Sequence, residues 1–350
     1  MAMRLVCLEK AAALHELCRR FSAAERALLE INDIDAAAVL PSGMSLLLPS
    51  GKAPEKQRLE LYVSKHEDSG QPVSGLVHRA SISAPESCTM SGRTVGSERH
   101  LPVLALMNLD EGGFVSPALA HRILTDEEGG CQLFQKLRLK LEGEGWGGVL
   151  LHMEYLFPFE RHAYTDFLSK LEKTVHAAGC WLMVSAPCAA VLAPESREGA
   201  AYDIAALAEI SDRLLLIPGK PLDGEAAEKC LAELCPLMPM GKLIYGIYPH
   251  GCIVRSSGSY RLSPVAAHNL AISAASPISR RGARSFAEFS FRDAAGELCR
   301  VQYSDVLCLS GLFGKLREYG VGGIFCPEVH GLAPAASALF DGLFSVEPLI

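Results

Sequence analysis

Several patterns that mark common protein classes are missing from this sequence of 350 residues. Its 12 cysteines include no C-x-x-C pair, which argues against a zinc ribbon or a dithiol redox site. No G-x-G-x-x-G motif follows a predicted strand, which argues against a dinucleotide-binding sheet. No apolar run reaches the roughly 18 residues that a membrane-spanning helix needs, so we expect no membrane span.

Positive charge is in the minority. The chain has 33 Lys and Arg residues against 40 Asp and Glu residues, a net charge of −7, and its pI is near 5.9. An acidic chain repels polyanions, so we expect no nucleic-acid partner. Residues 1–17 include Glu9 and only a short apolar stretch, so we expect no secretory signal peptide. Cysteines inside apolar runs favour synthesis in a reducing cytoplasm.

Apolar, strand-like runs alternate with helical patterns along most of the chain. Amphipathic helices are predicted between many of these runs, and one of them covers 161–178 with Phe167, Leu168, Leu171 and Val175 at helical spacing. The pattern predicts a (β/α)8 TIM barrel over 58–350, with an open doubly wound sheet as the alternative. The eight predicted strands lie near 59–63, 76–83, 103–107, 149–153, 181–186, 214–217, 243–247 and 323–326.

A longer segment over about 251–303 separates the last two predicted strands. It contains a predicted helix over 263–273 and a predicted hairpin of strands 286–292 and 297–303. We interpret this segment as a small insertion in the barrel, before its last strand.

Glu154 is the first candidate for a chemical role. A glycine-rich turn leads into the apolar run 149–151, and Glu154 follows that run. Such a run indicates a buried parallel strand, and TIM barrels carry their chemistry at the C-terminal ends of their strands. His152 lies two residues before Glu154, so the two side chains are expected on the same face of the strand.

Residues 1–50 predict a separate small unit, followed by a polar linker over 51–57. Its expected order is strand, helix, helix and strand, with helices over 11–20 and 22–31. Ser22 and Glu25 have the spacing of a capping box at the start of the second helix. Strands are expected near 4–7 and 44–48.

This βααβ order, the break after Ile31 and the turn at 40–43 resemble a LysM module. That family binds glycans that contain N-acetylglucosamine, so the resemblance implies a glycan-binding module. The Gly-Asp-Thr that precedes the first helix in the family, and that helps to hold sugar, is replaced here by three alanines at 11–13. A small cap without a ligand is therefore the alternative.

The barrel segments carry a second resemblance, which runs in order over almost the whole chain. The matching segments are 106–109 with Phe114, 148–155, 161–168, 202–203 with 210–213, 242–246, and 301–305 with 318–320. They resemble glycoside hydrolase family 18, and within it the LysM-bearing enzymes of spore germination that trim cortex peptidoglycan fragments.

This resemblance implies substrate-assisted chemistry, which differs from the two-carboxylate pattern of most glycosidases. A glutamic acid protonates the leaving oxygen, and the 2-acetamido carbonyl of the substrate attacks the anomeric carbon. Glu154 matches that acid. A general acid needs a raised pKa, which we expect Leu151, Met153 and Trp181 to provide through desolvation.

The other catalytic positions of the family differ in this sequence. The aspartate that orients the acetamide group is replaced by His152, and the earlier acidic positions are Gly147 and Leu150. The tyrosine after the sixth strand is absent from 217–219, and the tryptophan of the last strand is Pro327. The loss of one preorganised partner typically lowers the rate ~100- to 1000-fold.

The leading hypothesis is therefore a peptidoglycan-associated or cortex-associated glycan-binding protein, a pseudoenzyme of the family 18 type with weak or lost N-acetylglucosaminidase activity. One alternative is an active N-acetylglucosaminidase that uses Glu154 as its acid. Another is a structural spore-coat protein with no glycan ligand. The residues expected to contact sugar are Asn108, Asp110, Tyr245, Tyr248 and Glu328.

The same resemblance implies no cofactor and no metal ion. The expected partner is a glycan that contains N-acetylglucosamine, namely peptidoglycan or cortex fragments, and spore-coat proteins are further candidate partners. With no signal peptide expected, we predict deposition on the spore coat or cortex after synthesis in the cytoplasm.

Overall fold

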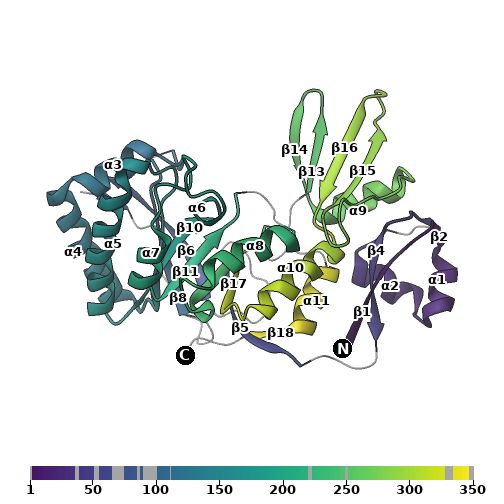
Figure 1. Ribbon diagram of the computed structural model, residues 1–350, viewed down its shortest axis with the longest axis horizontal. Helices are drawn as coiled ribbons and strands as arrows, with labels where there is room; N and C mark the ends of the chain where they lie inside the picture. Colours follow the sequence, from purple (N-terminus) through teal and green to yellow (C-terminus); the bar gives the residue numbers. More distant parts are fainter. Residues whose placement is uncertain are drawn as a thin grey trace.

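The structure, a computed structural model, describes residues 2–35, 39–50, 55–64, 75–84, 87–89, 101–110, 112–219, 223–248, 251–327 and 334–346. Glu328 and residues 51–54 of the predicted linker lie outside these described residues. The larger lobe contains the predicted barrel, and the N-terminal elements lie at the opposite end of the molecule beside two projecting hairpins (Figure 1).

Eight parallel strands form a closed ring. β5 pairs with β6 on one side and with β17 on the other, and this closes the ring and excludes an open sheet. The predicted TIM-barrel fold is therefore confirmed. In ring order the strands are β5 (Gln57–Ser64), β6 (Gly75–Ala84), β8 (Leu101–Met107), β9 (Gly148–His152), β10 (Trp181–Pro187), β11 (Arg213–Ile217), β12 (Leu243–Gly246) and β17 (Gly323–Cys326).

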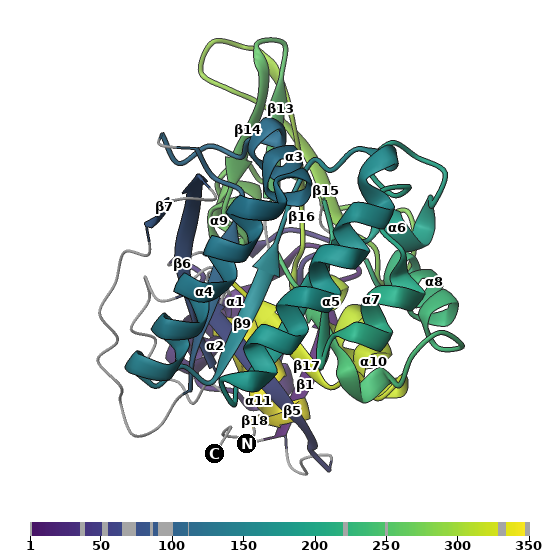
Figure 2. The same ribbon diagram turned by 90° about the vertical axis from the view of Figure 1, so that its left-hand side faces the viewer.

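Helices cover the outside of this ring, as Figure 2 shows for α3, α4, α5 and α7 around β9. The apolar positions predicted for α5 (Arg161–Ala177) are buried against the strands. The other elements around the ring are α3 (Pro117–Thr125), α4 (Glu127–Glu144), η1 (Pro158–Glu160), α6 (Ala189–Leu192), α7 (Ile204–Ile210), α8 (Gly224–Leu234), η2 (Met240–Lys242), α10 (Val306–Glu318) and α11 (Pro334–Leu343), with short strands β7 (Ser87–Thr89) and β18 (Phe344–Val346).

Side chains alternate between the two sides of the ring. Along β9, Val149 and Leu151 belong to the apolar layer under the helices. Leu150 belongs to the smaller cluster that fills the ring interior. His152 has the same parity as Leu150, so its side chain is directed to the interior at the C-terminal end of the strand.

The insertion forms a four-stranded antiparallel sheet with one helix. The sheet order is β14 (Gly258–Leu262), β13 (Gly251–Arg255), β16 (Leu298–Tyr303) and β15 (Ala287–Arg292), and α9 (Pro264–Ser273) packs on it. The predicted helix and the β15–β16 hairpin are both present. The β13–β14 hairpin was missed, because the residues of β14 are almost all exposed and show no apolar alternation.

The N-terminal elements are β1 (Ala2–Cys7), β2 (Ala12–Ala13), α1 (Leu14–Phe21), α2 (Glu25–Asn32), β3 (Val39–Leu40) and β4 (Ser45–Ser50), with β1 antiparallel to β4. The predicted capping box is wrong: Ala24 precedes α2, and Ser22 ends α1 in the left-handed conformation. The first helix also starts later than predicted, because β2 pairs with β3.

The N-terminal unit and the insertion share one hydrophobic core. Leu28 and Met44 of the first belong to the same buried cluster as Phe289 and Val301 of the second. The backbone N–H of Ile278 also donates to Ser42 O at 2.9 Å. The two segments are more than 200 residues apart in the chain, so they stabilise each other only in the complete fold.

Candidate functional site

The C-terminal end of β9 carries the site that the sequence predicts. Glu154 follows the strand with its side chain 40% exposed, and its Oε1 lies 2.7 Å from Nε2 of His152. The prediction that both side chains lie on one face is consistent with this contact. The imidazole is 16% exposed, so it lies beneath the carboxylate and nearer the ring interior.

Ser185 extends this pair into the barrel. Nδ1 of His152 lies 2.7 Å from Ser185 Oγ, and Ser185 Oγ lies 3.2 Å from the carbonyl oxygen of Leu151. The serine is 2% exposed, so its hydroxyl is not available to a substrate as a nucleophile. The chain Ser185–His152–Glu154 therefore orients the imidazole and the carboxylate.

Ser185 was not predicted as a site residue, although the sequence of its strand contains a signal. Strand β10 is apolar on both faces apart from this residue. Its register with β9 pairs Met183 with Leu150, and this places Ser185 in the same interior layer as His152. A single hydroxyl at an inward position of a buried strand was the available clue.

Asn108 fixes the backbone of Glu154. Its Oδ1 accepts from Glu154 N at 3.0 Å, and its Nδ2 donates to Glu154 O at 3.1 Å and to Ser116 O at 3.0 Å. The residue is 1% exposed and follows β8. These contacts make Asn108 a positioning residue, and they leave its predicted sugar contact without structural support.

The backbone just beyond Glu154 is strained. Tyr155 has φ of +56°, a conformation that non-glycine residues seldom adopt, and its side chain is 66% exposed. The hydroxyl of Tyr202 donates to Met153 O at 2.8 Å on the other side of Glu154. Strain of this kind costs about 1–3 kcal/mol and is found most often at functional sites.

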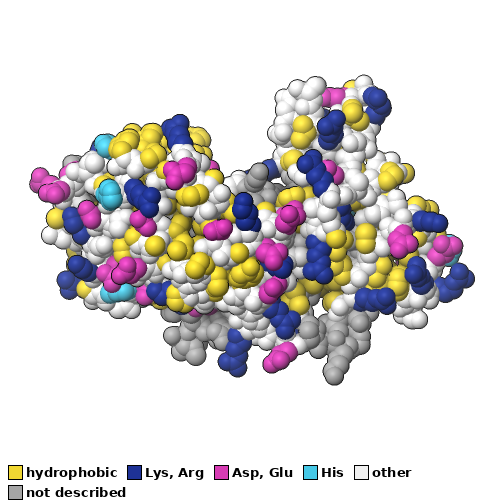
Figure 3. Space-filling model, viewed as in Figure 1, with side chains coloured by type: hydrophobic (Ala, Val, Ile, Leu, Met, Phe, Trp, Pro, Cys, Tyr) yellow, Lys and Arg dark blue, Asp and Glu magenta, His cyan; other side chains and the backbone are white. Residues whose placement is uncertain are grey.

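Other exposed aromatic side chains lie on the loops after β8 and β9. Phe114 is 74% exposed and Phe159 is 72% exposed. Phe159 stacks on Phe157 with ring centroids 5.4 Å apart, and Arg197 lies over the Phe157 ring. Figure 3 shows hydrophobic side chains gathered along the upper edge of the barrel lobe. Exposed rings on these loops suit the apolar face of a sugar.

The charge state of Glu154 does not fit a general acid. The hydrogen bond from His152 lowers the pKa of Glu154 below its usual value, and partial burial opposes this only in part. The expected raised pKa is therefore wrong. Trp181 begins β10 beside Gly148, four residues before His152 on the paired strand, so it lies too far away to desolvate the carboxylate.

The remaining predicted sugar contacts lie at different depths. Asp110 is exposed, and its Oδ1 accepts from the backbone N–H groups of Gly112 and Phe114, both at 2.9 Å. Tyr245 is only 1% exposed and packs in the layer under the helices, where burial raises the pKa of its hydroxyl. Tyr248 is half-buried after β12, and Glu328 lies outside the described residues.

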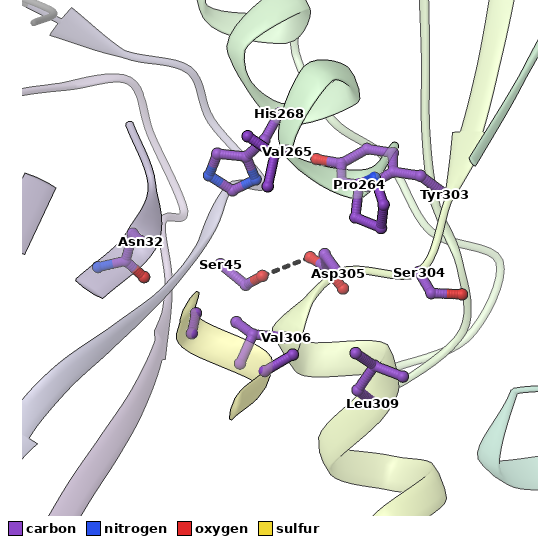
Figure 4. Close-up of a pocket in the computed structure, with 12 residues that line it drawn as sticks. Asn32, Ser45, Pro264, Val265, His268, Tyr303, Ser304, Asp305, Val306 and Leu309 are labelled. Atoms are coloured by element: carbon purple, nitrogen blue, oxygen red, sulfur yellow. Dashed lines mark hydrogen bonds between the residues drawn. The ribbon is translucent and has the colours of Figure 1, made fainter. Parts of the chain in front are cut away.

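A small cavity lies where the N-terminal unit, the insertion and α10 meet (Figure 4). Asp305 begins α10 as its N-cap and forms short contacts with Ser45 and Arg280. His268 and Tyr303 also line this cavity of about 20 Å³, and His268 Nε2 and Tyr303 OH have no hydrogen-bond partner among the described residues. The space fits one or two water molecules and is too small for a sugar. We therefore interpret it as part of the junction between the N-terminal unit and the insertion.

Metal binding has no support within the described ranges. No group of three or more His, Cys, Asp or Glu side chains there has the arrangement of a metal site. Every helix in the described residues is too short or too polar to span a bilayer.

Comparison with solved structures places the fold. The spore cortex-lytic enzyme SleL of Bacillus cereus superposes with a TM-score of 0.74 and 18% identity, over 98% of this chain and 87% of that chain. The SleL enzyme of Bacillus megaterium QM B1551 has a TM-score of 0.73 and 17% identity, over 99% of this chain and 87% of that one.

A chitinase from Chromobacterium violaceum ATCC 12472 has a TM-score of 0.70 and 16% identity, over 81% of this chain and 98% of that chain. No protein-family model matches the sequence, and no curated protein matches it either. At these identities the likeness is one of fold: the chain has the barrel fold of the spore cortex-lytic enzymes and of chitinases.

Proposed function

We propose that this protein binds glycans containing N-acetylglucosamine, such as peptidoglycan or spore-cortex fragments, at the C-terminal ends of its barrel strands, and hydrolyses them slowly or not at all. The contact of 2.7 Å between His152 Nε2 and Glu154 Oε1 carries this proposal. This contact lowers the pKa of Glu154 and favours its carboxylate form, which accepts hydrogen bonds from sugar hydroxyl and amide groups but has no proton to give a leaving oxygen.

The missing negative charge supports weak turnover. In substrate-assisted hydrolysis the acetamide becomes positively charged and needs an anionic neighbour, but His152 and Leu150 stand where the resemblance implies acidic residues. A neutral imidazole brings no such charge, and an imidazolium repels the developing cation. The exposed rings of Phe114, Tyr155 and Phe159 need no such charge to bind sugar.

An active N-acetylglucosaminidase is the second candidate, and the barrel fold shared with cortex-lytic enzymes favours it. It requires Glu154 to take up a proton once a glycan displaces water from the site. Because that state has one more proton than the free carboxylate, its hydrolysis rate would rise toward acidic pH.

We also propose that residues 1–50 form a LysM-like unit that acts as a cap. The loops of this unit form hydrogen bonds with the insertion. Asn269 Nδ2 donates to Asp33 O and Asn269 Oδ1 accepts from Asp35 N, each at 3.0 Å. Arg280 Nη2 donates to Gly43 O at 3.1 Å. These contacts support the interpretation of a cap without a ligand of its own.

A retention experiment tests glycan binding. The full chain is immobilised, and muramic-lactam cortex fragments and chitotetraose are passed over it, with Phe159→Ala and Tyr155→Ala as test variants. Glu209→Ala on α7, an exposed residue with no described role, serves as the control. Retention by the unmodified protein and the control, and a loss of about tenfold in the aromatic variants, is expected. No retention of either glycan would favour the structural coat protein.

A further inference from the structure

The insertion carries a charge opposite to that of the whole chain. Residues 251–303 contain seven arginines, no lysine and three acidic residues, a net charge of +4 in a chain of net charge −7. Figure 3 shows several dark blue side chains and few magenta ones over the region that Figure 1 labels β13 to β16. The insertion therefore attracts anionic ligands, although the whole chain is acidic.

The strand register places two of these arginines on the outer face of the sheet. Along β16, Cys299, Val301 and Tyr303 are buried, whereas Leu298, Arg300 and Gln302 are exposed. Arg300 pairs with Val254 of β13. Arg261 of β14 pairs with Cys252, which has the same outward parity as Val254. Arg261 and Arg300 therefore lie on the face turned away from the shared core, which we call the outer face.

The positive charge on the outer face is largely uncompensated. Neither Arg261 nor Arg300 forms a side-chain hydrogen bond or an ion pair within the described part of the chain. Glu288, the acidic residue of this face, already accepts from Gln302 Nε2 at 2.8 Å and lies 3.5 Å from Arg281. The other two acidic residues lie at the hairpin ends, where Glu297 accepts from Ser256 and Asp293 faces Arg255.

We propose that the outer face of this sheet docks a polysaccharide that bears carboxylate groups. A guanidinium group is planar, always charged and weakly hydrated, so it binds carboxylates with two parallel hydrogen bonds. Ser259, Ser290 and Gln302 have the same outward parity as the arginines and offer hydrogen bonds to hydroxyl groups. Its outward positions are mostly polar, with Val254 and Leu298 as exposed apolar residues among them, whereas a typical protein interface has a buried apolar centre.

The position of the insertion supports a glycan as the occupant. The insertion follows the C-terminal end of β12, the same end of the barrel at which Glu154 lies. One long glycan can therefore contact the barrel through its neutral sugars and the outer face through its acidic groups. The choice of a glycan rests on the proposed function, whereas the charge of the face does not.

The test measures binding of the full chain to oligogalacturonate, which has a carboxylate on every ring, by calorimetry at low and at high salt. The test variant is Arg261→Glu/Arg300→Glu. The control is Lys170→Glu/Lys173→Glu on α5, which changes the net charge by the same amount at a remote, exposed site. Chitotetraose, which is neutral, is measured with all three proteins.

We expect oligogalacturonate binding that weakens with salt, and a loss of at least about tenfold in the arginine variant against less than about twofold in the control. Chitotetraose binding should be equal in all three. An equal loss in both double variants, or none in the arginine variant, overturns the proposal. Tighter binding of duplex DNA or of an acidic protein than of oligogalacturonate overturns it as well. Loss of chitotetraose binding alone would instead count against the barrel site.

Discussion

Nε2 of His152 lies 2.7 Å from Oε1 of Glu154, and its Nδ1 lies at the same distance from the buried hydroxyl of Ser185. Three arrangements of protons satisfy these distances. A neutral imidazole donates to Glu154 and accepts from Ser185, whereas an imidazolium donates to both and frees the serine hydroxyl for Leu151 O. In the third, a neutral imidazole with its proton on Nδ1 donates to Ser185 and accepts from a protonated Glu154. The lowered pKa of Glu154 favours the first two arrangements, and the ionised carboxylate that they share underlies the proposed loss of turnover.

Replacing His152 should raise the pKa of Glu154. The hydrogen bond from His152 is the main cause of the lowered pKa, so His152→Ala leaves partial burial as the dominant influence on the carboxyl group. Carboxyl chemical shifts followed through a pH titration by NMR measure this. His176→Ala is the matched control, because it removes another histidine–carboxylate pair, with Asp212, elsewhere in the barrel. A pKa of Glu154 that does not rise in His152→Ala would contradict the assignment.

Asn108→Ala should destabilise the barrel and loosen Glu154. Three partly buried hydrogen bonds to Glu154 and Ser116 are lost, and the backbone groups left without partners cost about 1–3 kcal/mol in free energy of unfolding. Urea unfolding measures the change. Thr174→Ala, which removes one exposed hydroxyl bond on α5, should cost less than about 0.5 kcal/mol. Similar losses in the two variants would show that Asn108 has no special role.

Acid should weaken the junction between the N-terminal unit and the insertion. Burial, aided by the nearby positive charge of Arg280, lowers the pKa of His268 to about 4. The unfolded chain takes up a proton near pH 6.5 and the folded chain only near pH 4, so stability is complete above about pH 6.5. It falls by about 3 kcal/mol as the pH drops to about 4.

His268→Gln removes that proton uptake and should flatten the pH dependence of the urea midpoint between pH 6.5 and 4. Asp305 has the opposite effect on stability as the pH falls. Burial raises its pKa, so the folded chain binds this proton at a higher pH than the unfolded chain does. The difference between the unmodified protein and the variant isolates His268. An identical pH dependence in both proteins would refute its role.

Gly43→Ala should disrupt the same junction. Gly43 has φ of +76°, and an added Cβ would lie 1.8 Å from Ile278 O, a backbone atom that cannot move aside cheaply. Gly296→Ala is the matched control, since φ there is +80° but nothing lies within 4 Å. We expect about 1 kcal/mol of destabilisation from the backbone conformation in the control and distinctly more in Gly43→Ala, measured by thermal unfolding. Equal effects would mean that the close approach is unimportant.

Period-two alternation was enough to predict the pairing of His152 and Glu154, and the eight apolar runs were enough to predict the barrel. The same reasoning could not place Tyr245, because β12 is buried on both faces and gives no alternation to read. Asn108 and Ser185 were not recognised as supports for Glu154, since their partners come from neighbouring strands that only the closed ring brings together.

The N-terminal unit illustrates a different limit. Its two helices follow from local composition, but Ser22 has the chemistry of either a helix start or a turn, and local sequence does not decide between them. The left-handed turn at Ser22 is set by how α1 and α2 pack in a core shared with residues more than 200 positions away.

The most direct test of the central claim is mass spectrometry of muramic-lactam cortex fragments after incubation with the purified protein, with Glu154→Gln in parallel. Because Glu154 is held as a carboxylate and lacks an anionic partner, we expect bound but uncut fragments and no difference in products between the two proteins. New reducing-end N-acetylglucosamine products formed only by the unmodified protein would contradict the account and identify a working glycosidase.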